Sequence, residues 1–207
     1  MRKFFYLVIL LLGSQTALAK SPSYTFEATG GLFFPSDKNW ADYYGNDRML
    51  EASMSFSRRL FYVLDLGMSF NYGKDRGTAV LKSSGTKTGN VTYQILPVDL
   101  FAVFRARFGE NQWVVPYAGI GYTRFNYRQE IEGETDTQGA VNGRIYRAGL
   151  QILLDPLERG AAHDMYANYG VINSYLLLEA KHTSATVDST GASLGGRSYR
   201  IGFLLEY

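Results

Sequence analysis

From Lys20 onward, apolar and polar residues alternate with a period of two, which predicts β-strands rather than helices. In residues 62–72 one face carries only Tyr, Leu, Met and Phe, while the other carries only Val, Asp, Gly, Ser and Asn. An apolar face that begins and ends on an aromatic residue, opposite a small and polar face, is typical of a strand that crosses a bilayer and turns its polar face into a barrel.

The same alternation recurs along the chain and gives eight predicted strands: residues 24–32, 50–57, 62–72, 98–107, 117–123, 146–154, 176–181 and 199–207. We expect short turns at 57–60 and 109–112, and long polar loops at 35–48, 73–91, 128–143 and 184–196. The pattern predicts an all-β fold, an eight-stranded antiparallel transmembrane up-and-down barrel with periplasmic termini and four extracellular loops. The alternative, a soluble sandwich, would carry a polar outward face.

One connection departs from this alternation of short turns and long loops. Residues 155–170 fall where a short periplasmic turn is expected, and Asp155 followed by Pro156 resembles an N-cap with proline at the first helical position. We therefore predict one or two helical turns as a short periplasmic connection between strands 6 and 7.

The first 19 residues have the pattern of a signal peptide. A basic start at Met1-Arg2-Lys3 precedes an apolar stretch from Phe4 to Gly13, and small residues follow at Ala17 and Ala19. The apolar stretch is too short to span a bilayer. We predict a signal peptide over 1–19, cleaved after Ala19, and a barrel domain over 20–207.

Composition narrows the possible functions. The chain has 207 residues and no Cys, which excludes disulfides, thiolate metal sites and a cysteine nucleophile. Residues 1–19 hold two basic residues and no acidic ones, so their removal lowers the formal net charge from +2 to zero. A neutral chain without a long basic run gives no support for nucleic-acid binding.

Three segments resemble a known group of proteins: Gly30-Gly-Leu-Phe-Phe-Pro-Ser-Asp37, Pro116-Tyr-Ala-Gly-Ile-Gly121, and Leu194-Gly-Gly with Ile201-Gly-Phe-Leu-Leu-Glu-Tyr207. They resemble the first strand end, the fifth strand and the closing strand of the small eight-stranded outer-membrane barrels typified by outer membrane proteins X, W and A. The closing segment, with Ile201, Phe203, Leu205 and Tyr207 at alternate positions, is similar to the signal read by the barrel-assembly machinery. Members of that group serve as structural proteins, adhesins, small-molecule conduits or lipid-modifying enzymes, so the resemblance implies a fold more than an activity.

The predicted inward faces carry many charged side chains: Glu27, Glu51, Asp65, Asp99, Arg105, Arg107, Arg147, Glu179, Lys181, Arg200 and Glu206. The interior of an eight-stranded barrel is just wide enough for side chains to fill, and buried charges there are tolerated only when paired. We expect a salt-bridged, closed lumen; the alternative is a narrow polar conduit.

One constellation resembles a catalytic site. His182 and Ser184 form a His-x-Ser at the outer end of a late strand, as in the outer-membrane lipid A deacylase, and Asp188 would orient the imidazole. Ala185 stands where the deacylase pattern has Asn, which leaves the oxyanion without that donor. The alternative places His182 simply at the outer rim of the barrel.

Two further features concern the outer end of the barrel. Aromatic residues near the predicted strand ends, namely Trp40, Tyr43, Tyr44, Tyr122, Phe125 and Tyr127, predict a girdle at the membrane interface. Four acidic residues, Glu130, Glu132, Glu134 and Asp136, are either a solvated run or weak ligands for a divalent cation.

Together these patterns predict a non-enzymatic integral outer-membrane barrel of a Gram-negative bacterium that acts in envelope structure or surface interaction through its loops. The alternatives are a narrow channel for small hydrophobic or ionic solutes, and lipid A hydrolysis by His182 and Ser184. We expect no cofactor and no metal site. The expected partners are outer-membrane lipids, lipopolysaccharide and the barrel-assembly machinery, and the expected state is a monomer.

Overall fold

The computed structural model describes residues 23–37, 40–80, 87–109, 112–132, 135–186 and 193–207. The predicted signal peptide over 1–19 lies outside these residues. The strands are β1 (Tyr24–Pro35), β2 (Met49–Phe61), β3 (Leu64–Val80), β4 (Lys87–Arg105), β5 (Val114–Ile131), β6 (Thr137–Leu153), β7 (Asn173–Ala185) and β8 (Gly196–Glu206). Among the described residues, two helices accompany them, α2 (Trp40–Tyr44) and α3 (Arg159–Tyr169).

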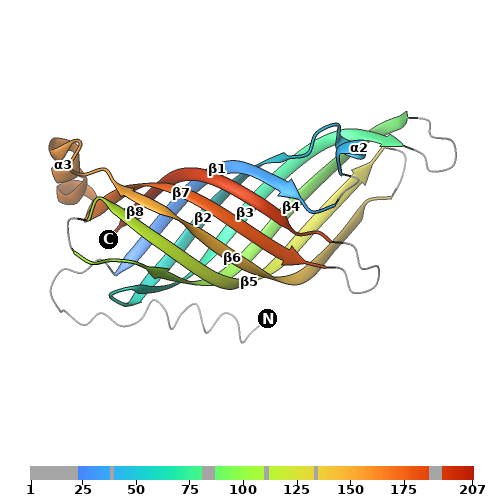
Figure 1. Cartoon of the computed structure of the whole chain (residues 1–207). Helices are drawn as coiled ribbons and strands as arrows, with labels where there is room; N and C mark the ends of the chain where they lie inside the picture. Colours follow the sequence, from blue (N-terminus) through green and yellow to red (C-terminus); the bar gives the residue numbers. More distant parts are fainter. Residues whose placement is uncertain (1–22, 38–39, 81–86, 110–111, 133–134, 187–192) are drawn as a thin grey trace.

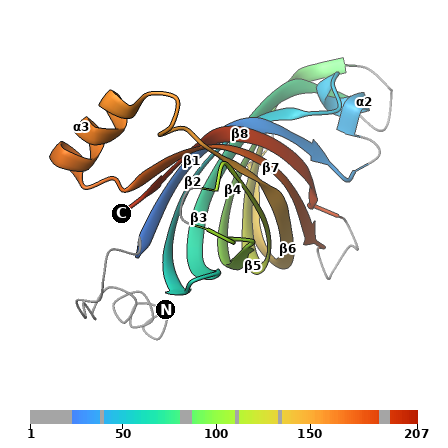
Figure 2. The same cartoon turned by 60° about the vertical axis from the view of Figure 1, so that its left-hand side comes forward.

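The eight strands form one closed antiparallel barrel in chain order, with β8 paired to β1 (Figure 1). Figure 2 shows the tilted strands curving around a common interior, with α2 and α3 at opposite ends. We call these ends the α2 end and the α3 end. The predicted eight-stranded barrel is therefore confirmed. Within the described residues, no helix has the length and apolar character needed to cross a bilayer.

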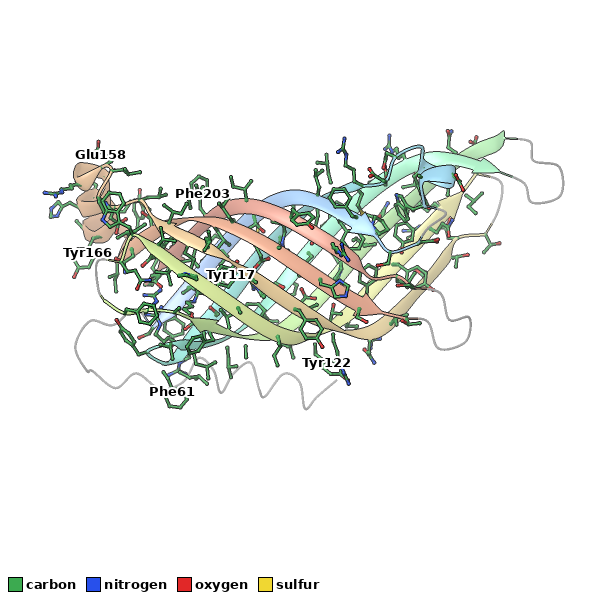
Figure 3. All side chains as sticks on the ribbon, in the orientation of Figure 1. Phe61, Tyr117, Tyr122, Glu158, Tyr166 and Phe203 are labelled. Atoms are coloured by element: carbon green, nitrogen blue, oxygen red, sulfur yellow. The ribbon has the colours of Figure 1, made fainter. Side chains whose placement is uncertain are left out.

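The outer wall carries a continuous apolar belt, because every second side chain points away from the interior. The exposed members include Met54, Phe56, Phe70, Phe104, Ile120, Leu150, Ile201 and Phe203. Figure 3 shows Phe61, Tyr122 and Phe203 projecting outward, whereas Tyr117 lies within the barrel. Apolar exposure on this scale marks a surface that meets something other than water.

Exposed aromatic residues border the belt at both ends. Tyr72, Tyr122, Tyr146 and Tyr199 lie toward the α2 end, and Phe61, Tyr62, Phe108 and Trp113 toward the α3 end. This arrangement matches the aromatic girdles of a bilayer-spanning barrel.

Two of the loops at the α2 end are shorter than the sequence pattern predicts, because the strands continue into them. β3 and β4 pair out to Val80 and Lys87, and β5 and β6 pair out to Gln129 and Thr137. The predicted loops at 73–91 and 128–143 are therefore mostly strand. β4 has 19 residues, about twice the 9–11 that a strand needs to cross a bilayer.

The turn between β2 and β3 also differs from the prediction. We expected it at 57–60, but β2 runs on to Phe61 and the turn lies at Tyr62 and Val63. Two adjacent arginines at 58–59 are typical of a polar turn. In the structure Arg58 faces outward with its guanidinium over the Tyr24 ring, and Arg59 faces inward. Alternation thus continues through both residues.

The predicted helix between β6 and β7 is present, but it begins later and is longer than expected. Its N-cap is Glu158, whose side chain accepts from the Gly160 amide at 3.0 Å, and it ends at Gly170 with φ of 72°. Asp155 instead accepts from the backbone and hydroxyl of Ser174 and so closes the base of the connection. No residue of α3 is buried, so the helix stands clear of the barrel.

Glycines on the inward face make room for large rings. A Cβ on Gly67 would lie 2.7 Å from the Cζ of Phe101, and one on Gly149 would lie 2.8 Å from the Cε1 of Tyr117. Only glycine fits beneath these rings. Phe101 and Tyr117 then form one apolar cluster with Val103, Ile145 and Leu177 in the middle of the interior.

Candidate functional site: a chain of ion pairs inside the barrel

Twelve charged side chains lie in the interior, each with a relative side-chain exposure of 8% or less. Six are acidic and six are basic: Glu27, Glu51, Asp65, Asp99, Glu179 and Glu206, with Arg59, Arg105, Arg107, Arg147, Lys181 and Arg200. The structure thus brings together all eleven residues that the alternation assigned to the interior, and adds Arg59. The set is formally neutral.

At the α3 end, five of these groups form a row in which positive and negative charges alternate. Glu206 pairs with Arg107 and, at 2.7 Å, with Nη2 of Arg59. Arg59 reaches on to Asp65 at 3.3 Å, and Asp65 accepts from Nε of Arg105 at 2.7 Å. Each carboxylate therefore lies between two guanidinium groups.

The middle of the interior continues the same order. Glu27 accepts from Arg105 at 3.2 Å and from Arg147 at 2.7 Å. Arg147 also pairs with Glu179, and its guanidinium carbon lies 4.4 Å from the centroid of the Phe101 ring. Arg147 thus joins two carboxylates while its flat face rests on an aromatic ring, which an arginine does better than a lysine.

Toward the α2 end, the alternation of acidic and basic groups continues and its last member is an acid. Glu179 pairs with Arg200, which reaches Glu51 at 3.3 Å. Lys181 then lies between Glu51, at 3.6 Å, and Asp99, at 3.1 Å. From Arg107 to Asp99, the twelve groups form one unbroken line in which acid and base alternate, which we call the ion-pair chain.

Uncharged donors add further hydrogen bonds to four of these carboxylates. Their hydrogen bonds are Tyr117 to Glu179 at 2.9 Å, Ser198 to Glu51 at 2.6 Å, Ser69 to Asp99 at 3.0 Å, Asn71 to Asp99 at 2.9 Å, and Asn173 to Glu206 at 2.9 Å. Within the described residues Asp99 pairs with a single cation, Lys181, and its Oδ2 also accepts from Ser69 and Asn71. Buried charges persist when partners and hydrogen bonds compensate for their lost hydration.

The α2 end of the interior is filled by apolar and aromatic side chains instead of charged ones. We call this cluster the aromatic cap; its buried members are Phe33, Trp40, Tyr44, Met49, Val91, Tyr93, Ile95, Phe125 and Ala185. Trp40 and Tyr44 come from α2 and stack with ring centroids 4.1 Å apart, and Tyr93 meets Trp40 edge-on at 5.1 Å. Burial, together with the neighbouring Tyr44, raises the pKa of Tyr93.

The aromatic cap corrects part of the predicted girdle. Trp40, Tyr44 and Phe125 are buried in the mouth of the barrel, and Tyr127 packs against them partly buried. Tyr122, by contrast, stands exposed on the outer wall. Alternation assigns Phe125 and Tyr127 to the inward face of β5, and this signal would have separated them from Tyr122.

The His-x-Ser pair does not form a catalytic arrangement among the described residues. His182 and Ser184 are both exposed on the outward face of β7, and no hydrogen bond joins them. The His182 ring instead lies alongside Tyr146, with centroids 6.5 Å apart. Asp188, the predicted acid, falls outside the described residues.

The acidic run after β5 is engaged by neighbouring side chains. Arg128 pairs with Glu130 at 3.1 Å and with Asp136 at 2.7 Å, and Glu132 accepts from Asn90 at 3.0 Å. Glu134 lies outside the described residues, within which no cluster of three or more metal-ligating side chains is present.

The residues of the predicted assembly signal lie on the outer face of the closing strand. Ile201 and Phe203 are more than half exposed, and Leu205 and Tyr207 are less so. Their strand, β8, joins β1 and β7 and so completes the barrel. Their reading by the assembly machinery stays a prediction.

Solved structures of other proteins share this fold. Neisserial surface protein A matches with a TM-score of 0.60 and 12% identity, over 91% of this chain and 100% of that one. The outer membrane protein OprG from Pseudomonas aeruginosa matches with a TM-score of 0.64 and 12% identity, over 91% of this chain and 97% of that one. The chain has the fold of the small eight-stranded outer-membrane barrels.

The likeness to these barrels lies in the fold alone, since so few residues are identical. No protein-family model matches the chain, and no curated protein sequence matches it.

Proposed function

We propose that the protein is an integral outer-membrane barrel with a closed lumen, and that its signal peptide is cleaved after Ala19 during export. It acts without catalysis, in envelope structure and surface interaction. The α2 end would face outward and the α3 end the periplasm. The apolar belt and its aromatic borders support the location, because such a wall needs a bilayer around it. As a structural element, the barrel would present its extended strands and α2 above the membrane.

The observation that carries the closed lumen is the ion-pair chain. A polar conduit needs groups that face water and exchange partners with a passing solute. Here each acid except Asp99 already lies between two cations, and Tyr117 and Ser198 add hydrogen bonds to two of the carboxylates. Opening such a lumen would separate several buried pairs at once, each at a cost of several kcal/mol, about 3–5 for one broken pair.

A conductance measurement tests this proposal. The mature protein is refolded, shown to be folded by its heat-dependent gel mobility, and inserted into a planar bilayer beside a general porin as the positive control. We expect no channel steps from the folded protein. Discrete steps that change in size in the Arg147→Met variant would make the ion-pair chain a channel lining and overturn the closed lumen.

A mass measurement tests the absence of catalysis. Lipid A is extracted from cells with and without the protein, and its acyl-chain content is compared. Equal masses are expected. Loss of one acyl chain that disappears in Ser184→Ala would instead assign hydrolysis to the outward-facing pair.

A further inference from the structure

A groove on the outer wall runs across β6, β7 and β8. Its volume is about 190 Å³, and its lining includes Tyr146, Ala148, Ala180, His182, Arg197 and Tyr199. The strand register explains its shape. Ala148 lies opposite Ala180, which lies opposite Tyr199, while Tyr146 lies opposite His182. Two alanines thus form a shallow floor between two tyrosines.

Cationic and polar groups gather at the α2 end of this groove. His182 lies opposite Arg197, and two residues further along β7 Ser184 lies opposite Arg144. All four side chains are exposed on the outward face. Strands are spaced about 4.8 Å apart, so the two arginines flank β7 at roughly 10 Å across the sheet, within reach of one group held between them.

These cations lack the acidic neighbours that surround the arginines of the ion-pair chain. Within the described residues, neither Arg144 nor Arg197 has a carboxylate at ion-pair distance. Arg128, further out on β5, already pairs with Glu130 and Asp136. The groove therefore combines an apolar floor with an uncompensated positive rim.

One ligand class fits both halves of the groove. A phosphate accepts bidentate hydrogen bonds from guanidinium groups and single ones from an imidazole or hydroxyl. An attached acyl chain would lie over the alanine methyls with the tyrosine rings on either side. Basic residues beside a membrane surface draw anionic headgroups in this way, at about 1 kcal/mol for each.

We propose that this groove binds a phosphorylated lipid of the lipid A type, with a phosphate at Arg144, His182 and Arg197 and an acyl chain over Ala148 and Ala180. The inference rests on the proposed function, because only an α2 end that faces outward brings the groove to the outer leaflet. It also gives His182 and Ser184 a binding role in place of a catalytic one.

Retention of lipid in native mass spectrometry tests the proposal. The folded protein in detergent is titrated with purified bisphosphorylated lipid A and with its dephosphorylated form. We expect the wild type to retain the phosphorylated lipid, and the variant Arg144→Gln/His182→Gln/Arg197→Gln to retain it at least about tenfold less. Ala180→Trp, which fills the floor, should weaken both forms of the lipid.

The matched control is Arg159→Gln, which removes an exposed arginine at the start of α3, at the opposite end of the barrel. It should retain lipid A like the wild type. Equal retention by the wild type and the triple variant, or by the two forms of the lipid, overturns the proposal. Should the triple variant fail to fold, the single Arg197→Gln gives the same comparison. Failure of the wild type to insert into a bilayer would count against the proposed function instead.

Discussion

The ion-pair chain and the aromatic cap fill two sections of the same lumen by opposite means. In the ion-pair chain every group is tolerated only because of its neighbours, so the loss of one leaves others buried and unpaired. In the aromatic cap each ring contributes by its own burial, and its neighbours can close around a gap. Two equally buried regions therefore differ in how far the effect of one substitution spreads.

The largest effect is expected at the centre of the ion-pair chain. Arg147→Met keeps an apolar stem over Phe101 but leaves Glu27 and Glu179 each without one cation. We expect the free energy of unfolding to fall by about 3–5 kcal/mol in urea titrations followed by gel mobility. Arg147→Lys should lose less, because one charge remains, and a Met variant as stable as the wild type would show that the chain is not cooperative.

A smaller loss is expected from an uncharged donor to the chain. Tyr117→Phe removes the hydroxyl that donates to Glu179 at 2.9 Å while the ring stays in its apolar cluster. A hydrogen bond to a charged group contributes about 1.5–3 kcal/mol, which sets the expected loss. Tyr122→Phe on the exposed outer wall is the matched control and should leave the urea midpoint unchanged.

The aromatic cap should respond to alkaline pH rather than to the loss of one partner. Because burial raises the pKa of Tyr93, the folded state keeps its proton above pH 10 while the unfolded state releases it. The stability from this residue is complete below about pH 10 and falls by up to about 1.4 kcal/mol per pH unit above it. Tyr93→Phe should flatten that part of the pH profile, which tyrosinate absorbance can follow; an unchanged slope would refute the assignment.

The smallest effect is expected at an ion pair outside both regions. Arg128 pairs with Glu130 and Asp136, but all three side chains are well exposed. The pairing raises the pKa of Arg128, chiefly through its hydrogen bond to Asp136. Exposed pairs contribute little, so Arg128→Gln should leave the urea midpoint where it was. A shift as large as that of Arg147→Met would remove the distinction between buried and exposed pairs.

Alternation in the sequence identifies the strands and the inward charges because both depend on a period of two. It fails at Arg59, since two adjacent arginines look like a turn when one of them in fact belongs to the interior. It also fails beyond the apolar belt. There the outward positions, such as Thr92 and Gln94, become polar, while inward ones, such as Val91, join the aromatic cap, so the two faces exchange character although pairing continues.

The aromatic cap and the groove could not be predicted because they depend on distant segments meeting. Trp40 reaches Tyr93 only through the placement of α2 beside the mouth of the barrel. The groove needs Ala148, Ala180 and Tyr199 at one height on three strands, and the register of those strands fixes that height. Sequence spacing within one strand carries no such information.

The ion-pair chain has a consequence for how the strands find their partners during folding. A slip of one residue turns a strand's apolar face into the lumen, so alternation alone resists it. A slip of two residues keeps every side chain on its proper face and displaces it by only about 6.6 Å along the strand. Because the twelve charges come from seven strands or their ends and alternate in one order, such a slip would bring like charges together or leave them unpaired. The buried charges therefore discriminate between registers that hydrophobicity treats as equal.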